Sequence, residues 1–339
     1  MKYVSMAEPK KVEIKTGNKP KPKKGEALLR IIYGGICGSD MGLYKGHMDA
    51  YASYPRIPGH ELSAEIVEIE ENEYGLKEGT IVTVNPYFNC HECYSCERGF
   101  VNCCVHNKTM GLAIDGGFAE YITMPIERIY DGKGLNAKTL VLIEPFCISY
   151  HAVKRANVQP GEKVLVVGAG TIGIFALMAA KLKGAEVYIS DVVEQKLAFA
   201  QKMGADGVIF NDNNENFKEK VDAITDGKGF DVLIEAVGHP MTMMNCIDGA
   251  AHMARIVEVG ISSRKMDFDF SIVQRKELNI FGSRNALKED FIELIDIVRS
   301  GRIDISPMIT NMYDIDQTAQ AFEDLDRNIG NNLKTIIKF

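Results

Sequence analysis

The sequence lacks two features that would tie it to a membrane or to nucleic acid. No stretch approaches the length of uninterrupted apolar residues needed to cross a bilayer, and the first ten residues hold no apolar core of signal-peptide length. Positive charge is in deficit, with 39 Lys and Arg against 46 Asp and Glu and a formal net charge of −7. A nucleic-acid binder carries the opposite balance. We therefore expect a cytoplasmic protein that binds neither a membrane nor nucleic acid.

What is present indicates a globular protein of more than one domain. The chain has 339 residues, which exceeds the roughly 250–300 at which one hydrophobic core stops growing. Hydrophobic residues make up 46% and charged residues 25%, a composition too apolar for a largely disordered chain. Of the 8 cysteines, five lie between positions 90 and 104. In a reducing compartment such clustering indicates a metal site before it indicates disulfides.

The segment from residue 163 to about 282 alternates short β-branched runs with amphipathic stretches of helical length. This pattern is typical of βαβ units and a parallel sheet. Strands are predicted at 163–167, 185–190, 207–210, 230–236, 254–259 and 277–282. These are the six strands that a doubly wound dinucleotide-binding fold requires. A helix is predicted over 171–183, where apolar residues cover almost every face, as expected of a helix buried against a sheet.

The rest of the chain has a different pattern. Within residues 1–145, short alternating runs at 26–32, 80–84 and 117–123 are broken by Gly, Pro and Asn, which predicts a mainly antiparallel β domain. After residue 285 we expect helices at 288–299 and 315–327 and a final apolar run at 333–339. The predicted fold class is therefore α/β, with a β-rich domain and a doubly wound parallel-sheet domain.

A glycine-rich loop follows the first predicted strand of the parallel sheet and opens a helix. Its spacing, Gly168-x-Gly170-x-x-Gly173, permits a tight turn and close approach of the backbone to a pyrophosphate. Asp191 ends the next strand, where a carboxylate accepts hydrogen bonds from ribose hydroxyls. No Arg follows it, so NAD is favoured over NADP. The alternative is a turn that serves packing alone, with Asp191 as a helix cap. The expected cofactor-binding residues are Gly168, Gly170, Thr171, Ile172, Gly173, Asp191, Val237 and Val259.

Two groups of residues have the chemistry of metal ligands. Cys90, Cys93 and Cys96, with Cys103 or Cys104 as the fourth member, supply enough thiolates to close a tetrahedral zinc site of structural type. The spacing does not choose between the last two. A second set is scattered along the chain and consists of Cys37, His60, Glu61 and Glu144. Together these form an open zinc site with room for substrate, although each taken singly is more often a buried thiol or a capping carboxylate.

These residues belong to an ordered series of motifs. Cys37-Gly38-Ser39-Asp40, Gly59-His60-Glu61, the four-Cys segment, residues 115–121, Glu144-Pro145 and the glycine-rich loop follow one another along the chain. In this order they resemble the zinc-containing medium-chain alcohol/polyol dehydrogenases over the whole length of the chain.

The resemblance implies a discontinuous catalytic domain. It implies a GroES-like catalytic domain at 1–148 with a zinc lobe at about 88–107, a Rossmann NAD-binding domain at 149–285, and a return to the catalytic domain at 286–339. It further implies Cys104 as the fourth structural ligand, one structural and one catalytic Zn²⁺ per chain, NAD as cofactor, a small polyhydroxy substrate, and a homodimer or homotetramer.

Shorter motifs at 143–148, 282–286, 289–291 and 333–339 are similar to a branch that oxidises hexonic acids at C5, which includes L-galactonate and L-gulonate 5-dehydrogenases. Oxidation of sorbitol or galactitol and 3-dehydrogenation of L-threonine remain alternatives within the class. Outside the class, the alternative is a non-catalytic protein that binds NAD and zinc and senses redox state through Cys103.

The resemblance also implies roles for single residues. Cys37, His60 and Glu61 hold the catalytic zinc, with Glu144 as a fourth or exchanging ligand. Ser39 receives the substrate proton, and Asp40 orients the imidazole or caps a turn. Many relatives carry a relay His where this chain has Gly42, which leaves His47 or water for that task. The candidates for binding a substrate carboxylate are Arg284, Lys45 and Arg56.

Overall fold

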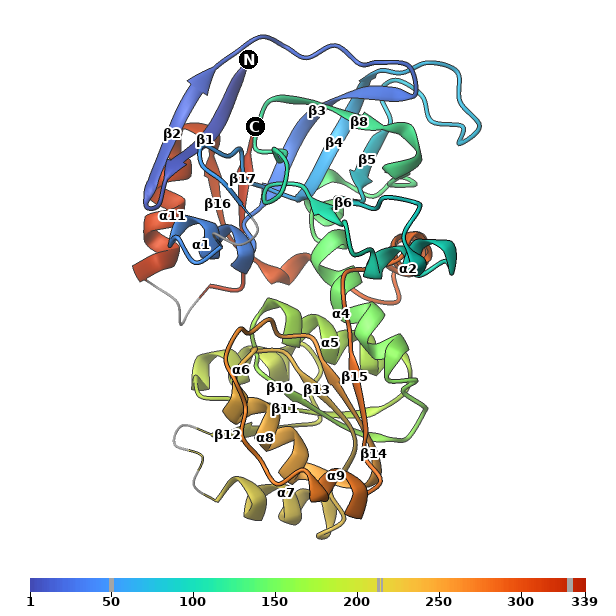
Figure 1. The fold of residues 1–339 in the computed structure, drawn as a ribbon, viewed down its shortest axis with the longest axis vertical. Helices are drawn as coiled ribbons and strands as arrows, with labels where there is room; N and C mark the ends of the chain where they lie inside the picture. Colours follow the sequence, from blue (N-terminus) through green and yellow to red (C-terminus); the bar gives the residue numbers. More distant parts are fainter. Residues whose placement is uncertain (49–51, 212–213, 215, 328–331) are drawn as a thin grey trace. The chain divides into compact units, whose positions relative to one another are not determined.

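The structure is a computed structural model that describes every residue except 49–51, 212–213, 215 and 328–331. It divides into two compact units, each described by itself below (Figure 1). Unit 1 comprises Met1–Pro145 and Leu287–Phe339, and unit 2 comprises Phe146–Ala286. The sequence predicts the two boundaries after residues 148 and 285. Among the helices that the structure describes, none is long and apolar enough to span a membrane.

Unit 2 is built on a parallel sheet of six strands in the order β12-β11-β10-β13-β14-β15. In chain order the strands are β10 (Lys163–Val167), β11 (Glu186–Asp191), β12 (Gly207–Phe210), β13 (Phe230–Glu235), β14 (Ala250–Glu258) and β15 (Asn279–Gly282). The chain therefore runs outward from β10 in one direction and then from β13 in the other. The strand order reverses between β10 and β13, which makes this pair the topological switch point.

Helices cover the sheet of unit 2. They are α5 (Thr171–Leu182), α6 (Glu194–Lys202), α7 (Phe217–Thr225), α8 (Pro240–Gly249) and α9 (Ser271–Arg275), while α4 (Ile143–Arg155) enters this unit from unit 1. The residues of α5 from 173 to 180 are all buried, as the apolar pattern predicts. The four valine and leucine residues that end β10 are buried too, because a parallel strand is covered on both faces.

Unit 1 contains a seven-stranded, mainly antiparallel sheet. Its path runs β16-β17-β3-β4-β5-β9, and β8 pairs with β3 beside this path. The bounds are β3 (Glu26–Gly35), β4 (Glu61–Glu68), β5 (Ile81–Val84), β8 (Tyr121–Pro125), β9 (Ile129–Asp131), β16 (Ile309–Asp314) and β17 (Lys334–Lys338). The C-terminal strand β17 lies antiparallel to β3, so the last residues of the chain join the domain that the first residues begin. The predicted fold class is confirmed.

Smaller elements complete unit 1. Two hairpin-like pairs are β1 (Lys2–Glu8) with β2 (Lys11–Thr16) and β6 (Tyr87–Phe88) with β7 (Lys108–Thr109). The helices are α1 (Gly38–Tyr44), α2 (Tyr94–Glu97), α3 (Ala137–Leu140), α10 (Lys288–Arg299) and α11 (Thr318–Arg327), with short 3₁₀ turns η1 (Val101–Cys103), η2 (Ile126–Arg128), η3 (Ser306–Met308) and η4 (Ile315–Gln317). The predicted helix at 315–327 is thus a 3₁₀ turn followed by α11.

The strand predicted at 117–123 is wrong in its first half. In the structure the strand is β8 and begins at Tyr121. The first of these residues bond to another loop, since Gly117 N donates to Gly59 O at 2.8 Å and Phe118 N donates to Pro58 O at 3.0 Å. The segment also has isolated bonds to β1, where Val4 N donates to Phe118 O at 2.8 Å. A Cβ at Gly116 would lie 2.4 Å from Gly59 O, so this approach requires glycine. The segment therefore supports the loop that carries His60.

Candidate functional site

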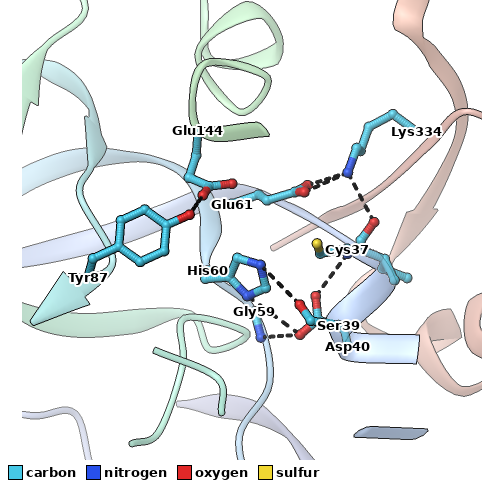
Figure 2. A network of polar contacts seen from close by, with 10 residues as sticks. Cys37, Ser39, Asp40, Gly59, His60, Glu61, Tyr87, Glu144 and Lys334 are labelled. Atoms are coloured by element: carbon cyan, nitrogen blue, oxygen red, sulfur yellow. Dashed lines mark hydrogen bonds and ion pairs between the residues drawn. The ribbon is translucent and has the colours of Figure 1, made fainter. Parts of the chain in front are cut away.

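Two neighbouring strands of unit 1 bring three predicted ligands together (Figure 2). Strand β3 ends at Gly35, which lies opposite Glu61 at the start of β4. Cys37 follows the first strand and His60 precedes the second, so thiol, imidazole and carboxylate meet, with one ligand atom of each within 4.8 Å of the others. A Cβ at position 35 would lie 2.1 Å from Glu61 Oε2. The close approach of the two strands at this point therefore requires glycine.

A buried carboxylate holds the cysteine and histidine segments in register. Asp40 accepts hydrogen bonds from Cys37 N at 2.9 Å and from Gly59 N at 3.1 Å. Its Oδ1 faces His60 Nδ1 at 3.8 Å, and Ser39 Oγ lies 3.4 Å from His60 Nε2. Burial opposes the charged imidazole, but the charges of Asp40 and Cys37 raise the pKa of His60 well above its ordinary value. Asp40 therefore links the backbone of Cys37 to that of Gly59 and lies beside the ring, and its role in orienting the imidazole stays a prediction.

Glu61 is held by a buried lysine that the sequence does not predict. Both of its carboxylate oxygens accept hydrogen bonds from Lys334 Nζ, at 2.6 and 2.7 Å, and the same ammonium donates to Ile36 O at 3.2 Å (Figure 2). The side chains of Lys334 and Glu61 are 3% and 0% exposed. Burial alone would lower the pKa of Lys334, but the charges of Glu61 and Cys37 raise it above its ordinary value. The pair is therefore ionic and sits beside the thiol.

The second carboxylate of the predicted set, Glu144, lies near the first three ligands but outside their group. Among the described residues, the atoms within 4.8 Å of one another do not include its oxygens. It is buried on α4, where the hydroxyl of Tyr87 donates to its Oε1. Burial raises the pKa of Glu144 to about 7, and the charge of Glu61 acts in the same direction, whereas His60, Tyr87 and Lys334 oppose this rise. Glu61 is therefore bonded by a buried ammonium, whereas Glu144 is bonded by a neutral hydroxyl.

The donor set of this centre fits a zinc ion. A thiol, an imidazole and a carboxylate are ligands that zinc accepts in open sites, where a position remains for water or substrate. Among the described residues, His60 Nδ1 is buried without a hydrogen-bond partner. A buried ring nitrogen in that state is stabilised when the other nitrogen binds a metal and Nδ1–H turns to a carboxylate, here that of Asp40.

The four predicted thiols of the zinc lobe also lie together. The distances between sulfur atoms are 3.5 Å for Cys93 and Cys96, 3.9 Å for Cys93 and Cys104, and 3.5 Å for Cys90 and Cys104. A zinc ion with bonds of about 2.3 Å requires edges of roughly 3.8 Å in a tetrahedron of sulfur atoms. Backbone N–H groups of Cys96 and Val105 lower the pKa of Cys93 to about 6, which favours the thiolate.

The adjacent Cys103 provides a matched control for this site, because it is exposed and outside the group, whereas Cys104 is buried within it. We expect Cys104→Ser to lose about one zinc per chain and to unfold at lower temperature, because structural zinc contributes its binding energy to folding. Cys103→Ser should keep the full zinc content and unfold as the wild type does. Elemental analysis and thermal unfolding measure both effects. Equal zinc content in the two variants would contradict this ligand assignment.

The glycine-rich loop of unit 2 leaves room for a phosphate group. Gly168 has a positive φ of 104°, and a Cβ at Gly173 would lie 1.7 Å from Gly168 O, so both positions require glycine. A Cβ at Gly170 would meet no described atom within 4 Å. That open space lies at the N-terminus of α5, where backbone N–H groups favour an anion. The loop therefore fits the pyrophosphate of a dinucleotide.

Asp191 closes this loop. Its Oδ2 accepts a hydrogen bond from Ala169 N at 2.6 Å, and its Oδ1 accepts one from Val193 N at 2.9 Å. Each carboxylate oxygen retains a further acceptor position, which suits a pair of ribose hydroxyls. Asp191 thus ties the first strand of the dinucleotide fold to the second and still offers the acceptors that the sequence predicts.

The ends of β13 and β14 adjoin the glycine-rich loop. Val237 is half exposed, and a Cβ at Gly168 would lie 2.5 Å from its Cγ2. Val259 N donates to Glu235 O at 2.9 Å, so the two strand ends are bonded to each other. The carboxylate of Glu235 is buried at this junction, in a strand end that the sequence places at the same carboxyl edge of the sheet but without a role for this side chain.

Two of the three cations predicted to bind a substrate carboxylate form ion pairs within unit 1. Lys45 forms an ion pair with Asp326 at 2.9 Å, and Arg56 forms one with Asp115 at 3.0 Å. Neither cation is therefore unpaired and available for a substrate carboxylate. Arg284 is exposed on the segment after β15.

The position expected of a relay histidine does not have room for one without a rearrangement. A Cβ at Gly42 would lie 3.0 Å from Met48 Cγ. His47, the alternative relay, is exposed to solvent.

Sequence analysis misses the roles of three residues at these sites: Lys334, Tyr87 and Glu235. The first two contact the predicted carboxylates only through the fold, since Lys334 is 273 positions from Glu61 and Tyr87 is 57 from Glu144. The one local signal is a lysine inside an apolar run, Leu333 to Phe339, which is unusual for a strand that becomes buried.

Comparisons with known proteins agree with this geometry. Residues 23–133 match the family model described as alcohol dehydrogenase GroES-like domain, and residues 171–300 match the one described as zinc-binding dehydrogenase. The chain is 35% identical over 342 residues to L-galactonate-5-dehydrogenase of Escherichia coli K12, covering 100% of this chain and 99% of the relative. It is 32% identical to L-threonine 3-dehydrogenase of Pyrococcus furiosus, with coverages of 90% and 89%.

A solved structure of an alcohol dehydrogenase also resembles this chain over its full length. It comes from Escherichia coli CFT073 and is described as a short chain alcohol dehydrogenase, RspB, complexed with cofactor NADH. It superposes with a TM-score of 0.91 at 30% identity and covers 100% of this chain and 99% of that one.

Proposed function

Because this chain belongs to the family of zinc-binding, GroES-like alcohol dehydrogenases, we propose that it oxidises a secondary alcohol of a sugar acid, a hexonate such as L-galactonate or L-gulonate at C5, with NAD as hydride acceptor. The observation that carries the enzyme class is the cluster of Cys37, His60 and Glu61 beside Ser39. A protein that only senses redox state requires no such open centre. The proposed reaction converts the alcohol and NAD⁺ into the ketone, NADH and a proton.

The catalytic zinc would be held by Cys37, His60 and the two carboxylates. Bound zinc supplies a Lewis acid that lowers the pKa of a substrate hydroxyl. Lys334 restrains Glu61 through two hydrogen bonds. Glu144 accepts a hydrogen bond from the neutral hydroxyl of Tyr87, so it is the less restrained of the two carboxylates. We therefore assign Glu144 as the exchanging ligand and Glu61 as the restrained one.

Ser39 is the proposed first acceptor of the substrate proton. Its hydroxyl lies beside His60 Nε2 at 3.4 Å and is partly accessible. A hydroxyl can accept a proton from the substrate while it donates its own onward, which general acid–base transfer at this position requires. Since Gly42 offers no relay group, we propose that the proton leaves through water. Asp40 keeps the imidazole in place and does not itself touch the substrate.

The NAD site is assigned to unit 2. Gly168, Gly170 and Gly173 form the cradle for the pyrophosphate, and Asp191 would accept the adenosine ribose hydroxyls. The same carboxylate would repel the 2′-phosphate of NADP. Support for NADH also comes from the RspB structure, which was solved with that cofactor. Thr171, Ile172, Val237 and Val259 are the remaining proposed contacts.

The sugar acid is preferred over other alcohols on the identity of the relative. The match to L-galactonate-5-dehydrogenase spans the whole chain at 35% identity, compared with 32% for the threonine enzyme over a shorter span. Short motifs of the hexonate branch support the same choice. Sorbitol, galactitol and L-threonine are the competing substrates.

A substrate panel tests the proposal. Reduction of NAD⁺ by the purified, zinc-loaded protein is measured with L-galactonate, L-gulonate, D-altronate, D-mannonate, sorbitol, galactitol and L-threonine, and repeated with NADP⁺. We expect the highest kcat/KM with a hexonate and NAD⁺. Turnover of threonine or of neutral polyols alone would overturn the sugar-acid assignment, and preference for NADP⁺ would overturn the role of Asp191.

We also propose that the protein is a homodimer or homotetramer. In the described part of unit 2, β15 is the outer strand of the sheet and carries the exposed side chain of Ile280. An outer strand with open backbone groups can pair with the same strand of a second copy. Sedimentation or light scattering measures the mass in solution, and a monomer at micromolar concentration would contradict the proposal.

A further inference from the structure

Glu235 is a buried carboxylate that accepts hydrogen bonds from the loop after β13 and from the first turn of α8. Its side chain is buried at the end of β13. Oε1 accepts from Val237 N at 3.0 Å, from Gly238 N at 3.0 Å and from Thr242 Oγ1 at 2.6 Å, and Oε2 accepts from Gly238 N at 3.1 Å. Every contact has the carboxylate as acceptor, which is the pattern of its ionised form.

No cation forms an ion pair with this carboxylate among the described residues, where its hydrogen-bond partners are backbone N–H groups and one hydroxyl. The titratable group beside it is the buried thiol of Cys246, whose pKa is raised by burial and by the charge of Glu235. Hydrogen bonds to the loop are therefore what keep the carboxylate stable in the interior. The loop N–H groups stabilise the buried charge, and the carboxylate in turn holds the loop backbone.

The same carboxylate fixes the contact between the ends of β13 and β14. A Cβ at Gly260 would lie 2.0 Å from Gly238 N and 2.5 Å from Glu235 Oε2, and a Cβ at Gly238 would lie 2.5 Å from Ile261 O. The backbone O of Glu235 accepts from Val259 N and Gly260 N at 2.9 and 3.1 Å. The two loops are therefore packed closely, and Glu235 bonds one of them through its carboxylate and the other through its backbone oxygen.

The position of this junction relates it to the cofactor. The switch point lies between β10 and β13, and a dinucleotide crosses a doubly wound sheet at the carboxyl edge of that pair. With the pyrophosphate at the Gly168 loop and the adenosine on the β11 side at Asp191, the nicotinamide half falls on the side of β13. Val237, which contacts Gly168 and is half exposed, is the loop residue that faces this edge.

We infer that Glu235 is a positioning residue for the nicotinamide half of NAD, acting through the backbone of residues 236–238. The inference rests on the proposed NAD-dependent function. It assigns Glu235 no contact with the cofactor and no part in the adenosine site.

The test compares two ligands that differ in the nicotinamide. Dissociation constants of NADH and of ADP-ribose, which lacks the nicotinamide, are measured by calorimetry for wild type and Glu235→Gln. In glutamine the oxygen can still accept from Val237 N and Gly238 N, but the amide nitrogen replaces Oε2, so the second bond from Gly238 N and the negative charge are both lost. We expect NADH to bind about tenfold more weakly, as loss of a charge-assisted hydrogen bond implies, while ADP-ribose stays within about twofold.

A second pair of variants keeps the test valid if Glu235→Gln does not fold. Thr242→Val removes the hydroxyl that donates to Glu235, and Thr242→Ser restores it. We expect the valine variant to weaken NADH selectively and the serine variant to rescue it. Equal weakening of both ligands, or no change in either, would overturn the inference. Failure of the wild type to bind either ligand would instead remove the proposed function on which it rests.

Discussion

Replacing Lys334 by methionine is expected to destabilise unit 1 by about 3–5 kcal/mol, because it leaves a buried carboxylate without its partner. Glu61 is fully buried, and both of its oxygens are bonded to the Lys334 ammonium. For a unit of this size the loss corresponds to a fall of roughly 10 °C in the midpoint of unfolding. Thermal unfolding of the zinc-free protein measures the effect without a metal to replace the missing charge.

Two variants control for the substitution itself. Lys338 lies on the same strand and is exposed, so Lys338→Met should change stability by less than about 0.5 kcal/mol. Lys334→Arg retains the charge and should recover part of the loss. If Lys334→Met unfolds at the temperature of Lys338→Met, the buried ion pair does not hold Glu61 as described.

Replacing Cys37 by serine should remove catalysis while leaving cofactor binding intact. Cys37 supplies the thiol of the proposed catalytic metal site, and loss of metal activation should lower kcat/KM by at least about 10³-fold, or roughly 4 kcal/mol in the barrier. The Gly168 loop and Asp191 belong to unit 2, so the dissociation constant of NADH should not change. Steady-state rates and calorimetry measure the two quantities.

The exposed thiol of Cys103 again offers the control. Cys103→Ser lies outside both metal groups and should keep wild-type rates. A Cys37→Ser enzyme that binds NADH normally and retains full turnover would be incompatible with a reaction centred on the metal.

The dinucleotide unit is largely predictable from local sequence. The valines of β10, the glycines after them and the apolar α5 follow one another within about twenty residues, so strand, turn and helix are each specified by adjacent side chains. Asp191 is the exception in one respect. Its predicted partner is a ribose, and the structure adds hydrogen bonds to the loop itself, from Ala169 and Val193.

The metal centre of unit 1 is only partly predictable. The residue types of Cys37, His60 and Glu61 indicate a ligand set, but their meeting depends on the pairing of β3 with β4. Lys334 reaches Glu61 because the C-terminal β17 pairs with β3 from the other side. Such pairings between distant strands leave no local pattern, which is why sequence analysis does not find this lysine.

Burial and ion pairing decide two further cases that the sequence leaves open. Neighbouring cysteines at 103 and 104 fit the zinc lobe equally well by spacing, yet Cys104 is buried in the group and Cys103 is exposed. Lys45 and Arg56 have the charge to bind a substrate carboxylate, yet each is paired with an aspartate. In both cases the answer depends on which neighbours the fold supplies.

The proposed reaction transfers a hydride directly from C5 of a hexonate to NAD⁺. Transfer of deuterium from that carbon to the cofactor tests this step. L-Galactonate that carries deuterium at C5 is incubated with the zinc-loaded enzyme and NAD⁺, and the NADH formed is examined by mass spectrometry. We expect NADH that contains the deuterium, together with a ketone at C5. NADH without deuterium, or no NADH from this substrate while another alcohol is oxidised, would contradict it.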